Sequence, residues 1–70
     1  MSFRQYRVMP EAVQRARDLG LYGDTAKRLA RAARRSAPLT SELGNRRFWN
    51  LALVVQGDTV VWVNRLEAAA

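Results

Sequence analysis

The stretch FWNLALVVQGDTVVWVNRL, residues 48–66, decides the fold because it supplies the bulk of the predicted core. Two runs of β-branched and aromatic residues flank Gln56-Gly57-Asp58-Thr59, a pattern typical of a β-hairpin. We centre the turn on Gly57-Asp58. A regular register then pairs Val55 with Val60, Leu53 with Trp62, Leu51 with Asn64 and Trp49 with Leu66.

This register divides the hairpin into two faces. The face predicted to receive the helices carries Trp49, Leu51, Leu53, Val55, Val60, Trp62 and Leu66. The other face carries an apolar patch, where a solvated sheet would alternate with polar residues. The patch consists of Ala52, Val54, Val61 and Val63. We expect a second copy of the chain or another partner to cover it rather than the N-terminal arm, because few residues remain for cover.

A first helix is predicted over residues 10–19. Proline suits the first helical turn, and Glu11 after it suits the positive end of the helix dipole. Gly20 is the expected left-handed residue that ends the helix, with Leu21 folding back on it. Upstream, residues 3–8 alternate as a short strand with Tyr6 on the inward side.

A second helix is predicted from an N-cap at Asp24, or alternatively at Thr25, to about Ala37, where Pro38 stops it. Its predicted apolar face carries Ala26, Leu29, Ala30 and Ala33. Residues 38–47 read as a loop because turn-forming residues are frequent there. The chain is therefore predicted to be one α+β domain, residues 1–70. It has a short N-terminal strand, two helices and a C-terminal β-hairpin, with the helices on one face of a small antiparallel sheet.

The second helix gathers cations opposite its apolar side. We call Lys27, Arg28, Arg31, Arg34 and Arg35 the basic face. Arg34 and Arg35 suit the negative end of the helix dipole, whereas Lys27 and Arg28 lie at the end where the dipole disfavours cations. Local stability does not require these two, which favours a binding role. Arg46 and Arg47 precede the hairpin and extend the predicted set to seven of the 12 basic residues.

The amino-acid composition limits the partners and the kinds of site that we predict for this protein. A net charge of +6 indicates a polyanionic partner. The chain has no cysteine and no histidine, and its carboxylates form no close set at ligand spacing. We therefore predict no metal, no cofactor and no catalytic set. Because no apolar run suits a membrane span or a signal peptide, we expect a cytoplasmic protein without a membrane partner.

The order of these elements, with an Arg-Asp-Leu-Gly-Leu ending on the first helix, resembles the compact RelE-like toxin superfamily. The resemblance covers about residues 4–66 and depends on Arg15, Arg17, Gly20, Leu21 and the hairpin Phe48–Leu66. The chain is similar to small relatives in that superfamily. The resemblance implies the fold and a ribosome- or RNA-facing role. Pro10-Glu11-Ala12 stands where those relatives usually place a histidine.

Three functions stay open at this point. The first is a small basic module that binds RNA or another nucleic acid through the basic face with Arg46 and Arg47. The second is a protein-binding inhibitor or regulator, such as a phage-encoded anti-defence protein of the anti-CRISPR kind, which uses the hairpin patch and the basic face. The third is a RelE-like endoribonuclease, in which Tyr6 or Tyr22 handles a proton beside Arg46, Arg47 or Arg65.

Overall fold

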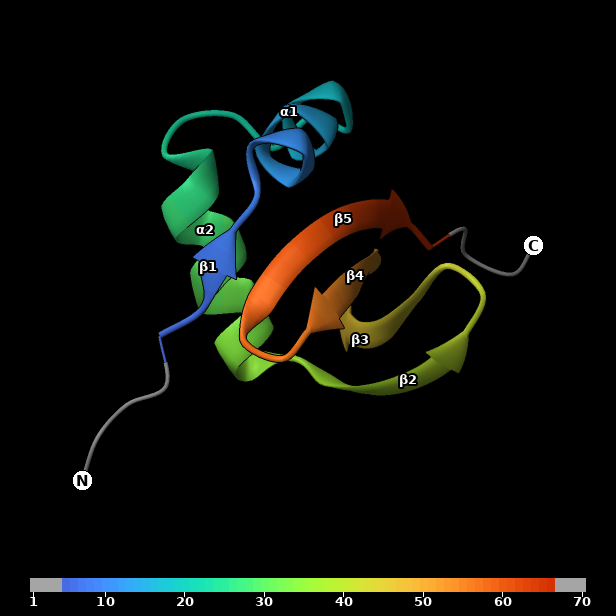
Figure 1. The fold of residues 1–70 in the computed structure, drawn as a ribbon. Helices are drawn as coiled ribbons and strands as arrows, with labels where there is room; N and C mark the ends of the chain where they lie inside the picture. Colours follow the sequence, from blue (N-terminus) through green and yellow to red (C-terminus); the bar gives the residue numbers. More distant parts are fainter. Residues whose placement is uncertain (1–4, 67–70) are drawn as a thin grey trace.

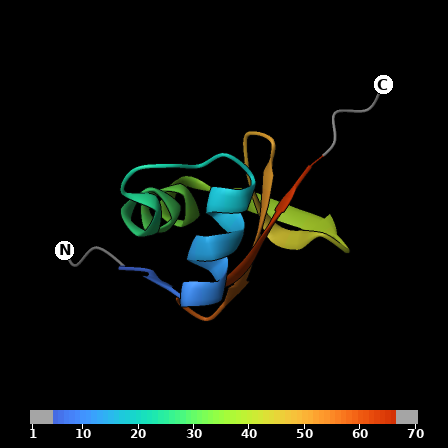
Figure 2. The ribbon, with the colours of Figure 1, turned by 90° about the horizontal axis from the view of Figure 1, so that it is seen from above.

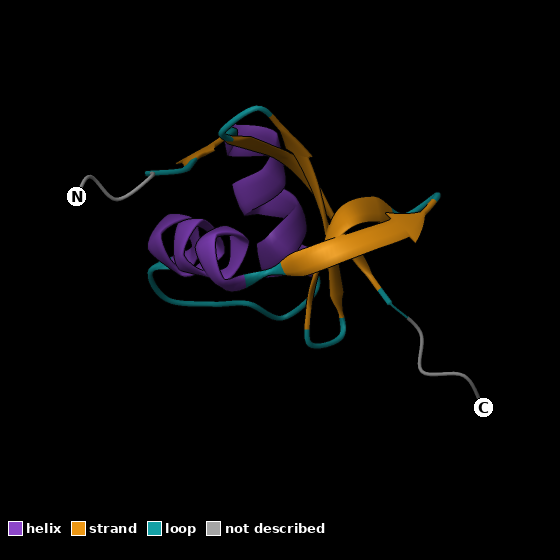
Figure 3. Cartoon of the chain, turned by 90° about the horizontal axis from the view of Figure 1, so that it is seen from below, coloured by secondary structure: helices purple, strands orange, loops and turns teal. Residues whose placement is uncertain are grey.

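The computed structural model describes residues 5–66 and shows an α+β fold with two helices and a five-stranded sheet (Figure 1). The helices are α1 (Pro10–Asp18) and α2 (Thr25–Arg35). The strands are β1 (Arg7–Val8), β2 (Ala37–Ser41), β3 (Gly44–Phe48), β4 (Leu51–Gln56) and β5 (Thr59–Arg65). Their order in the sheet is β1-β5-β4-β3-β2. Both helices lie on one side of it (Figures 2 and 3).

The sheet is mixed rather than antiparallel as predicted, because β1 runs parallel to β5. β1 is also shorter than the predicted strand over residues 3–8, of which residues 3 and 4 lie outside the described part. The other neighbouring strands pair antiparallel. The fold class of two helices packed on a small sheet is thus confirmed, while the strand number and the pairing are corrected.

Alanines let the helices approach the sheet closely. The fully buried large side chains are Leu29 from α2, Leu53 from β4, and Val60 and Val63 from β5. Around them pack small helix residues: Ala12, Ala16, Ala32 and Ala33. The buried side of α2 differs from the prediction, because Ala26 is exposed while Ala32 and Thr25 are buried. The sheet supplies most of the buried volume, as the sequence indicates.

The end of α1 follows the prediction. Gly20 has a φ of +101°, in the left-handed region that glycine adopts without steric cost. Its N–H donates to the carbonyl of Arg17, and the Leu21 N–H donates to the carbonyl of Ala16. These two bonds form a Schellman motif, which satisfies carbonyls at the helix end.

The structure confirms Asp24 as the N-cap residue of α2 but not its predicted capping bond, and the helix ends earlier than predicted. The Asp24 side chain makes no capping hydrogen bond, whereas the buried Thr25 hydroxyl donates to the Leu21 carbonyl at 2.8 Å. The helix ends at Arg35, before the predicted Ala37. Pro38 lies in the edge strand β2, a position that tolerates a residue without an N–H.

Residues 38–47 are not a loop, because they form most of the antiparallel pair β2–β3. Gly44 permits a close approach here: a Cβ at this position would lie 2.7 Å from the carbonyl oxygen of Leu53. The Asn45 side chain then takes the place of a backbone partner for Val55. It donates to the Val55 carbonyl and accepts from the Val55 N–H, both at 2.8 Å.

A β-bulge changes the predicted register of the β4–β5 hairpin. Val55 pairs with Val60 as predicted, but Val54 pairs with Trp62 and leaves Val61 as the extra residue. Beyond the bulge the predicted pairing is wrong by one residue. Leu53 pairs with Val63, so that Val63 enters the core in place of Trp62.

The predicted apolar patch is therefore not one exposed face. Val63 lies in the core and Ala52 is fully buried, whereas Val54 and Val61 are half-buried. Two members of the patch thus have no surface to offer a partner. The expectation of a homodimer or another partner on Val54 and Val61 stays a prediction.

Candidate nucleic-acid interface

The basic face lies on the side of α2 that points away from the sheet. At about 100° per residue, Lys27, Arg31 and Arg34 form one stripe along the helix. Arg28 and Arg35 flank this stripe, and Leu29, Ala32 and Ala33 are buried on the opposite side. All five basic side chains are exposed. Helical periodicity therefore brings the predicted α2 cations together on one surface.

Lys27 and Arg28 each have a contact within the fold. The Lys27 ammonium lies 4.0 Å from the Asp24 carboxylate, and both side chains are more than 70% exposed. Such an exposed pair contributes little to stability and leaves the ammonium open to other anions. The Arg28 guanidinium donates to the Tyr22 carbonyl at 2.9 Å, which holds the side chain against the link between the helices.

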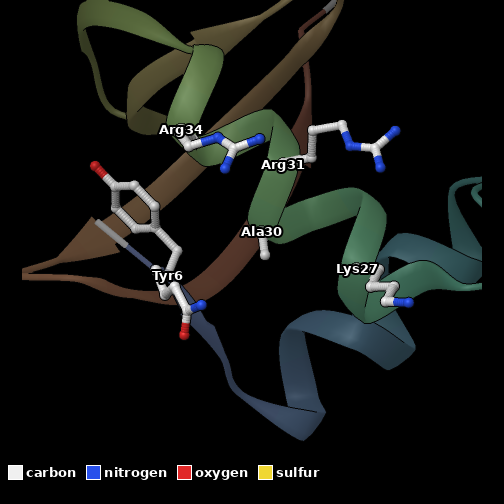
Figure 4. Close-up of a pocket in the computed structure, with 6 residues that line it drawn as sticks. Tyr6, Lys27, Ala30, Arg31 and Arg34 are labelled. Atoms are coloured by element: carbon white, nitrogen blue, oxygen red, sulfur yellow. The ribbon is translucent and has the colours of Figure 1, made fainter. Parts of the chain in front are cut away.

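A hollow of about 370 Å³ opens on one flank of the basic face; we call it the Tyr6 hollow. Figure 4 shows the Tyr6 ring beside α2, with Lys27, Arg31 and Arg34 spaced along the helix. Tyr6 is half-buried and also packs against the core, so its predicted inward position is confirmed. The hollow joins one aromatic ring to three cations.

A second hollow of about 300 Å³ lies on the other flank; we call it the Trp49 hollow. Its walls include Leu21, Arg28, Arg31, Phe48, Trp49 and Leu51. Arg31 lines both hollows, so this one side chain of the basic face connects the Tyr6 hollow with the Trp49 hollow. Apolar and cationic groups meet in this hollow, which is the combination found in sites for aromatic anions.

Trp49 is placed contrary to the sequence prediction. It was expected on the face that receives the helices, yet it is 81% exposed in the two-residue turn between β3 and β4. Among the described residues other than glycine, it is the one with a positive φ, +56°. Its ring stacks on Phe48 with centroids 5.9 Å apart and planes 9° from parallel. No turn signature of the Asn-Gly kind marks this position in the sequence.

Arg46 and Arg47 do not join the basic face as a pair. Alternation along β3 places Arg46 on the same side as Phe48, which packs against the core, and Arg47 on the opposite side. Arg46 is half-buried. The exposed Arg47 donates through Nε to the Trp49 carbonyl at 3.2 Å. Of the two, Arg46 lies on the helix-bearing side of the sheet.

The residues considered for proton transfer are spread over the molecule. Tyr6 lies beside Lys27, Arg31 and Arg34 rather than beside Arg46, Arg47 or Arg65. The Arg65 guanidinium donates to the Leu19 carbonyl at 2.7 Å, at the end of α1. The structure therefore groups Tyr6 with the cations of the basic face.

No cluster of histidine, cysteine or carboxylate side chains suited to a metal ion occurs within residues 5–66. Nor does this part of the chain contain a helix long and apolar enough to cross a membrane. Comparison of the chain with models of known protein families, with curated proteins and with solved structures gives no match. The basic face and its two hollows are therefore the features of the molecule that bear on its function.

Proposed function

We propose that this protein is a small basic module that binds nucleic acid, with RNA favoured, through the basic face of α2. One observation carries the proposal: five exposed cations lie on one helix face, between two hollows that each contain an aromatic side chain. Phosphates are bound by such cations, and aromatic rings accept bases by stacking. We place this binding in the cytoplasm.

The polarity of α2 supports binding rather than a purely structural role. Lys27 and Arg28 lie in the first turns, where the helix dipole opposes positive charge. The first turn contains no acidic residue, and Asp24 before it makes no capping bond. An approaching phosphate would offset this unfavourable charge.

The salt dependence of RNA affinity tests the proposal. The variant Lys27→Gln/Arg31→Gln removes two cations of the central stripe and keeps side chains that favour helices. If both contact phosphates, the slope of log affinity against log salt falls by about 1.4, which is two contacts at about 0.7 each for a single strand. Fluorescence anisotropy with a labelled oligoribonucleotide, repeated at several salt concentrations, measures this slope.

The variant Arg7→Gln/Arg17→Gln is a matched control, because it removes two exposed arginines outside the basic face and gives the same net charge. It should keep the wild-type slope. Equal slopes for the two variants would refute a role for the basic face. An acidic protein would complement the same cations, so the tagged chain should also be recovered from host lysate with and without nuclease. Absence of RNA affinity together with a nuclease-resistant protein partner would support an inhibitor instead.

A further inference from the structure

The Trp49 indole is exposed at a position where two local costs coincide. The residue is 81% exposed although its side chain is large and apolar, and its backbone occupies the left-handed region. A non-glycine residue pays a steric penalty for that conformation. In a two-residue turn with a positive φ at the first position only, glycine is the favoured residue there. Stability of the turn therefore does not explain a tryptophan.

The Trp49 ring has one aromatic neighbour within the fold. It stacks in parallel on Phe48, which itself packs against the core. The high exposure of Trp49 shows that much of the ring remains open to solvent. A ring that is stacked on one side and open on the other is suited to stacking with a planar ligand.

Positive charge lines the same hollow as the indole. Arg28 and Arg31 line it from α2, and the bond from Arg28 to the Tyr22 carbonyl restrains one of these side chains before any ligand arrives. A guanidinium has five donors, so Arg28 retains donors for a phosphate. Leu21 and Leu51 add apolar surface to the lining.

The volume and the polar groups fit a base better than a bare anion. The hollow measures about 300 Å³, at the lower end of the range of about 300–1,000 Å³ for small-molecule sites. Asn50 adds an amide to the lining, with a donor and an acceptor for the edge of a base. A paired base has its faces covered by its neighbours in the duplex, whereas an unpaired base offers a face for stacking.

We infer that the Trp49 hollow binds one unpaired nucleobase of a single-stranded nucleic acid, stacked on Trp49 with its phosphate at Arg28 and Arg31. This inference rests on the proposed function and narrows the ligand to single strands. Double-stranded ligands should contact the basic face through phosphates without engaging the indole.

Tryptophan fluorescence tests the inference directly. The variant Trp62→Phe keeps an aromatic ring near Arg15 and leaves Trp49 as the sole tryptophan of the chain. Three probes are titrated at low salt: an oligoribonucleotide, its duplex with the complementary strand, and an abasic strand of the same length. We expect the single strand to quench Trp49 emission strongly, and the duplex and the abasic strand to bind with little quenching.

A second variant measures how much the Trp49 ring contributes to the affinity for the single strand. Trp49→Gly suits the positive φ of the turn, and its affinity for the single strand should fall by about 5- to 150-fold. Its affinity for the abasic strand should be unchanged. Equal quenching by the abasic strand, or an unchanged single-strand affinity in Trp49→Gly, would overturn base stacking while leaving phosphate binding intact. Failure of the wild-type chain to bind any of the three probes would overturn the proposed function itself. Emission that shifts with protein concentration before any probe is added would assign the ring to a second copy of the chain.

Discussion

Replacing Trp49 with glycine and, separately, with alanine tests the reading of the β3–β4 turn. A buried tryptophan typically loses about 3–5 kcal/mol on truncation to alanine. Trp49 is 81% exposed and its φ is +56°. We therefore expect much smaller losses of stability, with the glycine variant more stable than the alanine variant. Glycine relieves the strain of the turn, while alanine keeps the strain and removes the ring.

The magnitudes follow from three contributions. Relief of a left-handed φ contributes about 1–2 kcal/mol, and the extra entropy that glycine loses on folding offsets about 0.5–1 kcal/mol of it. Loss of the stack on Phe48 costs about 0.5 kcal/mol, the lower end for an aromatic pair, because the indole is so exposed. The glycine variant should therefore lie within about 1 kcal/mol of the wild type. The alanine variant should lie about 1 kcal/mol below the glycine variant.

Thermal unfolding followed by far-ultraviolet circular dichroism measures the difference. In a domain of this size, 1 kcal/mol corresponds to about 4–8 °C in Tm. The same pair of substitutions at Asn50, whose φ is not positive, is the matched control and should reverse the order of glycine and alanine. An alanine variant of Trp49 that is as stable as the glycine variant, or more stable, would refute a strained turn. A loss of more than about 3 kcal/mol in either variant would refute an exposed ring.

Four further substitutions test the packing that positions the site. Asn45→Ala should lower the free energy of unfolding in urea by about 1–3 kcal/mol, because the N–H and carbonyl of Val55 lose their partners. Gly44→Ala should cost about 1–3 kcal/mol in the same assay, since its Cβ would meet the carbonyl of Leu53 and β3 must shift; an unchanged midpoint would refute the close approach. Leu53→Ala should cost about 2–5 kcal/mol as a cavity in the core. Thr25→Val should lower stability by about 1 kcal/mol through loss of its buried hydroxyl bond, and a neutral result in calorimetry would contradict that role.

The helices could be predicted closely from the sequence, whereas the pair β2–β3 could not. The end of α1 at Gly20 depends on local chemistry alone, and the structure confirms it. In β2, by contrast, four of the five residues are exposed, so no apolar alternation marks the strand. Its proline and serine are typical of a loop. Pairing with β3 across the sheet overrides these local preferences, and a single sequence carries little trace of that pairing.

The register of the β4–β5 hairpin is a second feature that could be predicted only in part from the sequence. The turn residues and the first pair, Val55 with Val60, follow from the sequence. One extra residue, Val61, then moves every later side chain of β5 to the other face. Trp62 and Val63 exchange their predicted environments as a result. Both residues suit a sheet interior, so hydrophobicity alone does not distinguish the two registers.

The candidate site likewise has one part that could be predicted from the sequence and one part that could not. The cations of α2 could be placed from the sequence because a helical period fixes their angular positions once the helix is recognised. The two hollows could not, since each depends on a segment distant in the sequence, namely Tyr6 for one and the Trp49 turn for the other. Arg47 was grouped with the basic face because it is close in sequence, and strand alternation separates it.

Arg31 connects the two halves of the surface, because it lines both hollows. Small alanine side chains on the buried side of α2 pack in the core, and Tyr6 and Trp49 line the hollows on the two flanks of the helix. A single-stranded nucleic acid bound as proposed would therefore cross α2 rather than run along it, with a phosphate near Arg31 and a base at Trp49. Lys27 and Arg34 lie about one turn from Arg31 along α2 and would then act on the same phosphates from either side of the crossing. Affinity should accordingly depend more on Arg31 than on either end of the stripe.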